Sequence, residues 1–451
     1  MEETMRNLGE QILALCTEKK YAKIRSMLIE MNPSDIACLF NDFPDEHALI
    51  VFRLLPKELA ADTFVEMDSD KQELLIKGFS DTELRDVMDE LYLDDAVDIV
   101  EEMPANVVKR ILANTDADTR TMINKILKYP EDSAGSIMTV EYVSLKKNMT
   151  VSDALQRIRR TGIDKETIYI CYVTDYDRHL LGIVTAKDLL LADEEDSISE
   201  IMTTNIIYVH THTDREDVAQ MFSKYNFLAL PVVDDEERLV GIVTIDDAMD
   251  VMEEEATEDI EKMAAIRPSE KPYFQTTVMQ TVKARIPWLM LLMISSTFTS
   301  IIITKFEDAL SVSIALSAAI PMLMDTGGNC GGQASVTIIR ALSLEDVEFK
   351  DIFKVMWKEF RVAIICGICL AAVNFLKMLL LRSGGVLISM TVSIALFFSV
   401  IVAKLVGCVL PMIANKLGFD PAVMSSPFVT TIVDALSLLL YFNLAVLLLG
   451  I

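Results

Sequence analysis

The sequence predicts a multidomain fold with an α-superhelical N-terminal part, an α/β tandem repeat and an all-α polytopic membrane region. The first observation is a charge split: residues 1–275 hold 58 acidic and 29 basic side chains, whereas residues 276–451 hold 10 and 12. The second is a series of uncharged apolar runs after residue 285, and the third is an internal duplication within residues 133–252. We expect domain boundaries that give segments 1–130, 131–252, 253–275 and 276–451.

The acidity of the first part narrows the possible partners and the compartment. Its net charge of −29, from 58 acids and 29 bases, argues against a nucleic-acid partner, because phosphate backbones attract the opposite charge. The polar start of the chain, MEETMRNLGEQ, lacks the pattern of a secretory signal. The seven cysteines show neither a disulfide framework nor a zinc spacing. We therefore expect the acidic part to lie in the cytoplasm.

Residues 1–130 show helical periodicity with short breaks. Amphipathic helices are expected at 35–43, 57–67 and 94–103, and together they would form a small superhelix. No catalytic constellation accompanies them. The breaks fall at Asn32-Pro33, Phe43-Pro44, Pro56, Ser80-Asp81 and Met103-Pro104.

The duplication in the middle of the chain is visible as a repeated motif. The segment LGIVTAKD from Leu181 to Asp188 recurs as VGIVTIDD from Val240 to Asp247. Each copy is expected to form a short strand, a helix, two strands and a closing helix. This pattern resembles a tandem pair of cystathionine-β-synthase (CBS) domains.

The CBS resemblance implies a candidate nucleotide site in the first copy. In that family the matching threonine and aspartate hold an adenine nucleotide, which makes Thr185 and Asp188 candidate ATP ligands, with Tyr172 or nearby apolar residues near the base. The alternative is that Asp188 only caps the closing helix. In the second copy Asp247 follows another aspartate, Asp246, which favours a cation over a nucleotide.

A run of acids from 246 to 261 follows the repeat and reads as a helix that ends before Pro268. A solvated helix face is the ordinary interpretation of such a run. Here the helix also joins the repeat to the membrane region. Together with Asp94, Asp95 and Asp98 it offers carboxylates on facing elements.

The apolar runs predict membrane-spanning helices near 284–304, 309–341, 353–381, 384–414 and 424–449. Of the Lys and Arg residues that flank them, eight lie on the side of the N-terminal part and three on the other. This bias places the N-terminal part on the cytoplasmic side of the cell membrane, and five spans then place the C-terminus outside.

Polar groups inside these runs are the strongest functional signal. Asp434 is costly to bury unless it faces water, an ion or a hydrogen-bonding neighbour. Asp325 and Asn329 accompany the glycines of 327–332, which would either interrupt a helix beside an ion pathway or simply allow close helix packing. Oxygen donors suit Mg²⁺ or Ca²⁺. Because one Asp434 per chain is too few for a pore, we expect a two-fold dimer.

The whole chain resembles the MgtE-type magnesium transporters, most sharply in Gly327-Gly-Asn-x-Gly-x-Gln333 and Pro427-x-x-Thr-Thr-x-x-Asp434. The resemblance implies a homodimeric, Mg²⁺-selective channel-like transporter in the lipid bilayer, closed by cytoplasmic Mg²⁺. It implies a pore site at Asp434, Asn329, Gly328 and Thr430. The regulatory Mg²⁺ ligands that it implies are Glu58, Asp94, Asp98, Glu216, Asp247, Asp250, Glu255, Glu258, Asp259 and Asp420. Asn226 stands where the family can have an acidic ligand.

Three other classes of protein share some of these features. A nucleotide-sensing transporter of an anion is disfavoured, because the membrane interior is expected to hold no Lys or Arg beyond Lys377 and Lys404. A membrane enzyme is disfavoured because no HExxH motif exists and none of the four histidines lies after residue 275. A receptor without ion flux is disfavoured by the acids beside the glycine segment.

Overall fold

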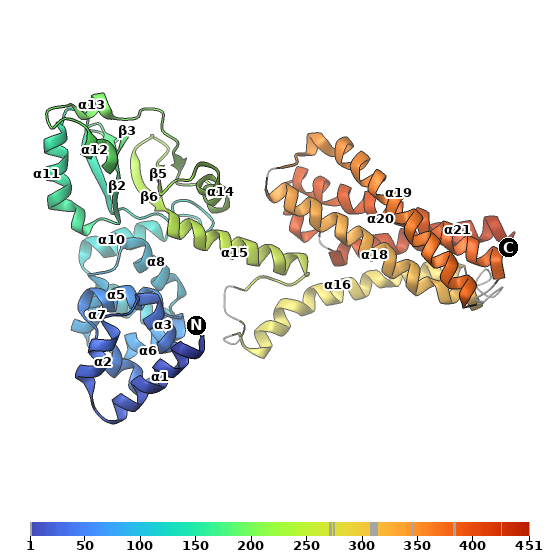
Figure 1. Cartoon of the computed structure of the whole chain (residues 1–451), viewed down its shortest axis with the longest axis horizontal. Helices are drawn as coiled ribbons and strands as arrows, with labels where there is room; N and C mark the ends of the chain where they lie inside the picture. Colours follow the sequence, from blue (N-terminus) through green and yellow to red (C-terminus); the bar gives the residue numbers. More distant parts are fainter. Residues whose placement is uncertain are drawn as a thin grey trace. The chain divides into compact units, whose positions relative to one another are not determined.

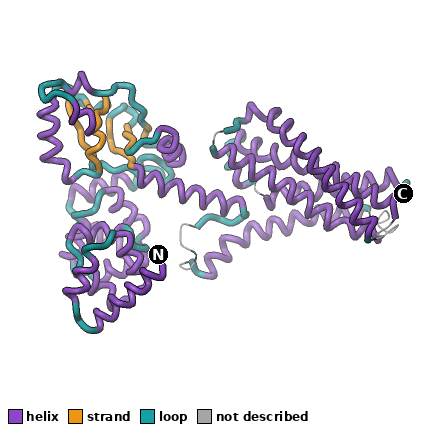
Figure 2. The backbone as a smooth tube through the Cα atoms, in the orientation of Figure 1, coloured by secondary structure: helices purple, strands orange, loops and turns teal. Residues whose placement is uncertain are grey.

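The computed structural model describes residues 2–269, 273, 276–306, 314–344, 346–381, 385–424 and 426–450. The chain forms two compact units, Met1–Met252 and Glu253–Ile451. The first unit holds the N-terminal helices and the repeat (Figure 1). Among the described residues, strands occur only in the repeat, as Figure 2 shows in orange. The fold class expected from the sequence is confirmed.

The N-terminal part is a succession of short helices, and each of the five predicted breaks lies at the start of one of them. Ser80 begins α7 with a capping box, in which its hydroxyl accepts from the Glu83 amide and Glu83 accepts from the Ser80 amide. Pro56 and Pro104 precede α5 and α9, where the missing amide hydrogen costs nothing. The helices are α1 Glu2–Thr17, α2 Tyr21–Leu28, α3 Pro33–Asp42, α4 Asp45–Phe52, α5 Lys57–Val65, α6 Ser69–Gly78, α7 Asp81–Met88, α8 Leu93–Glu102, α9 Ala105–Asn114 and α10 Ala117–Ile126.

One buried core runs through the first unit. In the N-terminal helices it contains tilted or edge-on phenylalanine pairs such as Phe52 and Phe64, whose ring centroids lie 6.0 Å apart. The same core includes Val97 on α8, Phe222 in the second copy of the repeat and Ala248 after it. Because interiors are close-packed, this shared core packs α8 against the second copy in this structure.

The repeat forms two matching three-stranded sheets. In each, the first strand pairs in parallel with the second, and the second pairs antiparallel with the third. The strands are β1 Tyr142–Lys146, β2 Thr167–Thr174, β3 Leu180–Thr185, β4 Val209–His210, β5 Ala229–Val233 and β6 Leu239–Thr244. The helices are α11 Val151–Thr161, α12 Ala186–Leu191, α13 Ile198–Ile201, α14 Arg215–Tyr225 and α15 Ile245–Met263. The predicted duplication is confirmed, and α15 continues past the boundary between the two units.

The long helices of the second unit are α16 Val278–Lys305, α18 Ile314–Ser343, α19 Ile352–Leu380, α20 Gly385–Lys416 and α21 Ser426–Leu449. Within the described residues, α16, α19, α20 and α21 are long and apolar enough to cross a membrane. The remaining predicted span, 309–341, corresponds to α18. This helix carries Asp325 and four glycines that lower its mean hydropathy. The expected starts at 309 and 384 and the linker end near 275 lie outside the described residues.

The glycine segment does not interrupt its helix, so the expectation of a broken backbone was wrong. α18 continues as one helix through residues 314–343. A Cβ on Gly328 would lie 2.7 Å from the Thr430 methyl group on α21, and a Cβ on Gly407 of α20 would overlap the Gly331 carbonyl. The glycines therefore let α18 lie in close contact with α20 and α21, as small residues do between membrane helices.

Candidate cation sites

The carboxylates of α8 and of the start of α15 meet in the first unit. Asp94, in the first turn of α8, is 6% exposed, and its Oδ1 accepts a hydrogen bond from the Asp95 amide at 3.0 Å. Asp247, in the first turn of α15, is near enough for its charge to act on Asp94. Asp98 follows one turn later on α8, with an exposed side chain on which Asp247 also acts. Three predicted ligands are thus brought together.

Burial raises the pKa values at the centre of this cluster, and neighbouring carboxylates add to the effect. Burial places the pKa of Asp94 well above its ordinary value, with the charge of Asp247 as the next cause. The same two causes raise the pKa of Asp95 to about 7. Burial raises the pKa of Asp247 to about 6, although the hydrogen bond from Thr244 lowers it. A bound divalent cation would relieve this mutual repulsion, and carboxylate oxygens are the ligands that Mg²⁺ prefers.

Glu166 is a member of this cluster that the sequence analysis missed. It lies just before β2, and its Oε2 atom is buried without a hydrogen-bond partner among the described residues. Burial raises its pKa to about 8, and the charges of Asp246 and Asp95 add to that. Glu166 lies 72 positions from Asp94 in a different domain, and no motif in its neighbourhood signals a ligand.

The repeated Thr-x-x-Asp motif forms the same local structure in both copies. The Thr185 hydroxyl donates to Asp188 Oδ2 at 2.6 Å, and the two residues make a capping box at the start of α12. The Thr244 hydroxyl likewise donates to Asp247 Oδ2 at 2.6 Å. Asp188 therefore has the capping role that the sequence left as an alternative. A nucleotide role for Thr185 and Asp188 stays a prediction.

Tyr172 lies in the core rather than on a surface. Its side chain is fully buried, packs edge-on against Tyr142 with centroids 5.8 Å apart, and has no hydrogen-bond partner for its hydroxyl in the described part of the chain. It shares a core cluster with Leu239 and Ile242 of the second copy. Tyr172 thus joins the two sheets, and its predicted contact with a base stays a prediction.

The remaining predicted ligands of the first unit are Glu58, Asp250 and Glu216, which lie on three different helices. Glu58 is exposed in the first turn of α5, beside Asp62, whose charge reaches Asp95. Asp250 is exposed on α15 and acts on Asp247. Glu216 lies in the first turn of α14 and accepts a hydrogen bond from Gln220 at 3.2 Å.

A second acidic group lies in the second unit, at the end of α15. Asp259 and Glu258 are half-buried there, and Asp420 stands in the turn before a 3-10 helix, Pro421–Val423. Burial raises the pKa of Asp259, and the charge of Asp420 adds to it. Lys262 reaches both sides: its Nζ lies 2.5 Å from Glu258 Oε1 and 2.7 Å from Asp420 Oδ2. Glu255 lies one turn earlier on the same helix and is also half-buried.

In the membrane helices the structure brings α18 and α21 together at the predicted pore residues. Gly328 contacts Thr430, one turn before Asp434 on α21. Asp434 is half-buried, and its Oδ1 is buried with no hydrogen-bond partner among the described residues. Asp325 on α18 is near enough for its charge to act on Asp434. Asn329 is exposed on α18.

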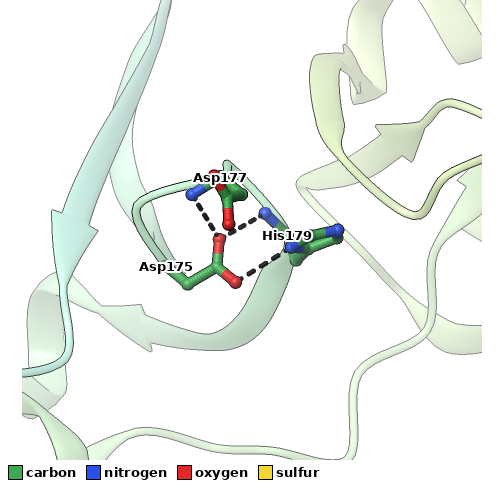
Figure 3. Close-up of side chains that lie close together, drawn as sticks. All are labelled: Asp175, Asp177 and His179. Atoms are coloured by element: carbon green, nitrogen blue, oxygen red, sulfur yellow. Dashed lines mark hydrogen bonds and ion pairs between the residues drawn. The ribbon is translucent and has the colours of Figure 1, made fainter.

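A third group of possible ligands, Asp175, Asp177 and His179, is better explained as a turn. Asp175 Oδ1 accepts from the amides of Asp177 and His179, and Oδ2 lies 2.9 Å from His179 Nδ1 (Figure 3). In the second copy Asp234 Oδ1 accepts from the amides of Glu236 and Arg238 in the same way, although no histidine is present. The aspartate at this position closes the strand connection in both copies.

Models of known families match three consecutive parts of the chain. The MgtE intracellular N domain matches residues 31–132, and the CBS domain matches residues 134–195 and 198–254. The model described as MgtE, divalent cation transporter, matches residues 320–444.

Similar proteins cover nearly the whole length. The chain is 38% identical to the magnesium transporter MgtE of Thermus thermophilus over 94% of this chain and 95% of that protein. It is 32% identical to the magnesium transporter MgtE of Bacillus subtilis over 96% of each.

A crystal structure of the cytosolic domain of the Mg²⁺ channel MgtE in complex with ATP is also similar. It is 37% identical, with a TM-score of 0.52, and covers 54% of this chain and 99% of that one. These relatives are transporters and not enzymes. Identity at this level over nearly the full length shows that the chain belongs to the MgtE family.

Proposed function

We propose that this protein is a Mg²⁺-selective, channel-like transporter that is closed by Mg²⁺ bound on its cytoplasmic side. The observation that carries the regulatory part is the buried carboxylate cluster of α8 and α15, in which burial and the charge of Asp247 raise the cost of ionising Asp94, and burial and the charge of Asp246 raise that of Asp247. The relatives named as magnesium transporters support the choice of ion. Oxygen-only donors fit a hard cation.

Regulation follows from which state the ions bind more tightly. When they are ionised, the carboxylates of α8 and α15 repel one another, which favours separation of the two elements. Bound Mg²⁺ would neutralise them and favour their packed arrangement. Because α15 continues as one helix from this cluster to the one at Asp259, a displacement of its first turn would also displace its last turn. Ions must bind the closed state more tightly for this linkage to close the pathway.

For the pathway itself we propose Asp434 as the principal ion ligand, with Asn329, Gly328 and Thr430 beside it. The buried, unpartnered Oδ1 of Asp434 supports this, since a carboxylate in a membrane segment needs an ion, water or a partner. The protein would act as a homodimer that brings two such carboxylates to one axis, with the C-terminus outside. Exposed apolar side chains of the first CBS copy, Ile163, Leu190 and Leu191, supply a surface for such pairing.

ATP is a proposed modulator that would bind at Thr185 and Asp188. The similar cytosolic domain that was crystallised with ATP supports it. In calorimetry with the full chain, Asp188→Ala should abolish ATP binding, while Asp177→Asn, in an exposed turn of the same copy, should leave it intact. Unchanged ATP affinity in Asp188→Ala would remove this site.

Measurements of Mg²⁺ uptake into liposomes test the proposed pore ligand and the proposed regulation separately. In liposomes loaded with a Mg²⁺-sensitive dye, Asp434→Asn should lose uptake, because the amide keeps the shape but not the charge. Asp247→Asn with Asp250→Asn should keep uptake but lose inhibition by internal Mg²⁺. Selective flux that survives in Asp434→Asn would overturn the pore assignment, and unchanged inhibition in the double variant would overturn the regulatory one.

A further inference from the structure

The end of α15 already carries a positive charge where the proposed regulation would place a metal ion. Lys262 Nζ lies 2.5 Å from Glu258 Oε1 and 2.7 Å from Asp420 Oδ2, so one ammonium joins a helix to a distant turn. The three side chains keep 26%, 31% and 35% of their surfaces exposed, so solvent screens them only in part. Asp259 faces the same place, since the charge of Asp420 acts on it.

We propose that Lys262 is a tethered competitor of Mg²⁺ at this cluster, and that it sets the concentration at which the cluster fills. This inference rests on the proposed regulatory role of Glu258, Asp259 and Asp420. Mg²⁺ binds carboxylate oxygens at about 2.0–2.1 Å. An ion held by the same two oxygens that Lys262 contacts would come within about 4 Å of Nζ, where like charges repel strongly. The ammonium must therefore leave before the ion is bound by both carboxylates.

The chemistry of lysine suits this exchange. Its ammonium is a compact charge on a flexible four-carbon stem, so it can swing toward solvent without disturbing the helix backbone. Because it is attached to the same helix, its effective concentration at the carboxylates is high and does not change with the composition of the cytoplasm. Free Mg²⁺ then has to exceed a threshold set by the chain itself. While Mg²⁺ is scarce, the same ammonium keeps the end of α15 attached to the turn at Asp420.

A natural reporter lies beside this lysine. A cavity of about 300 Å³ in the second unit is lined by Lys262, Arg267, Trp288, Val423 and neighbouring apolar residues. The chain has two tryptophans, and the other, Trp357, is 59% exposed on α19. In a Trp357→Phe background the fluorescence of Trp288 therefore reports on the surroundings of Lys262 independently of transport.

The experiment is a Mg²⁺ titration of Trp288 fluorescence in the full chain, reconstituted in nanodiscs. Lys262→Met should move the midpoint to lower Mg²⁺ by about tenfold or more, because the competing charge is gone. Lys262→Arg keeps the charge and should stay within about threefold of the parent. Lys283→Met removes an exposed lysine of α16 and should also stay within that range.

Any other result would overturn either the competition by Lys262 or the regulatory role of the cluster. An unchanged midpoint in Lys262→Met, or a midpoint at higher Mg²⁺, would show that Lys262 supports the bound ion or only ties the structure together, and the competition would be refuted. If the parent shows no Mg²⁺ response while Asp420→Asn also shows none, the regulatory role of this cluster fails, and the inference fails with it. Lys262→Arg provides the test of competition if Lys262→Met does not fold, because a midpoint more than tenfold lower in Arg would contradict it.

Discussion

At the scale of the residue, burial and like charge combine at Asp94. It is 6% exposed, and the charges of Asp247, Asp95 and Glu166 all act on it. Asp94→Asn keeps the oxygen that accepts from the Asp95 amide but removes the charge. We expect the metal-free protein to gain about 1–3 kcal/mol in free energy of unfolding, the usual cost of an uncompensated buried polar group.

The same variant should lose part of the stabilisation that Mg²⁺ provides, because one ligand charge is gone. Thermal unfolding with and without Mg²⁺ measures both effects. The control is Asp177→Asn, an exposed turn residue, which should change neither. A metal-free Asp94→Asn protein that is less stable than the parent would show that the carboxylate has a favourable partner in the folded state.

At the scale of the element, α19 and α20 are joined by a buried ion pair that the sequence did not reveal. Lys404 Nζ lies 3.6 Å from Glu359 Oε2, and the two residues are 5% and 9% exposed. Removing one partner leaves the other charge buried and alone. We expect Lys404→Met to cost about 3–5 kcal/mol, and Lys404→Met with Glu359→Gln to recover most of that loss.

A double-mutant cycle on the detergent-solubilised protein measures this coupling. Lys377→Met is the matched control, because Lys377 is an exposed lysine of α19. A coupling energy near zero would mean that Glu359 and Lys404 each find other compensation, and that the pair does not fix the two helices together.

At the scale of the whole molecule, the carboxylate cluster predicts how stability depends on pH. The pKa values of Asp247, Asp95 and Glu166 are raised to about 6, 7 and 8 by burial and neighbouring acids, from ordinary values of 3.8 and 4.5. Between those limits the folded state binds more protons than the unfolded state. The free energy of unfolding of the metal-free protein should therefore fall as pH rises from about 4 to about 8.

Mg²⁺ should reverse this trend, because it binds the ionised carboxylates of the folded state and its stabilisation grows over the same pH window. Melting temperatures at fixed pH, with Mg²⁺ or with a chelator, give the two curves. If the chelated protein became more stable between pH 4 and pH 8, the pKa values would be lowered rather than raised by folding.

The sequence predicted the elements of this fold well where local chemistry decides them. Pro104 and Ser80 marked helix starts, and the repeated LGIVTAKD and VGIVTIDD segments gave the two sheets. It also placed Asp94 and Asp247 on facing elements. Their meeting could be expected, because the resemblance supplied the arrangement of the two domains.

What the sequence did not predict depends on tertiary contacts. Glu166 joins its cluster only through folding, and the contact of Lys262 with Asp420 also forms only through folding, whereas the contact of Lys262 with Glu258 is local to α15. For the glycines of α18 an interrupted helix was one of two alternatives, because glycine is a poor helix former in water. Contact with Val429 and Val433 of α21 and with the backbone of α20 at Gly331 leaves no room for larger side chains, and there glycine gives close packing instead.

The hydrogen bond from Thr244 to Asp247 has a consequence for the entropy that is lost when an ion binds. The hydroxyl holds the carboxylate at 2.6 Å in one rotamer before any ion arrives. Freezing a free side chain at the moment of binding would cost about 0.5–1.5 kcal/mol, and here that entropy is lost during folding instead. Asp247 thus receives an ion as a rigid ligand, and a threonine one helical turn away is responsible.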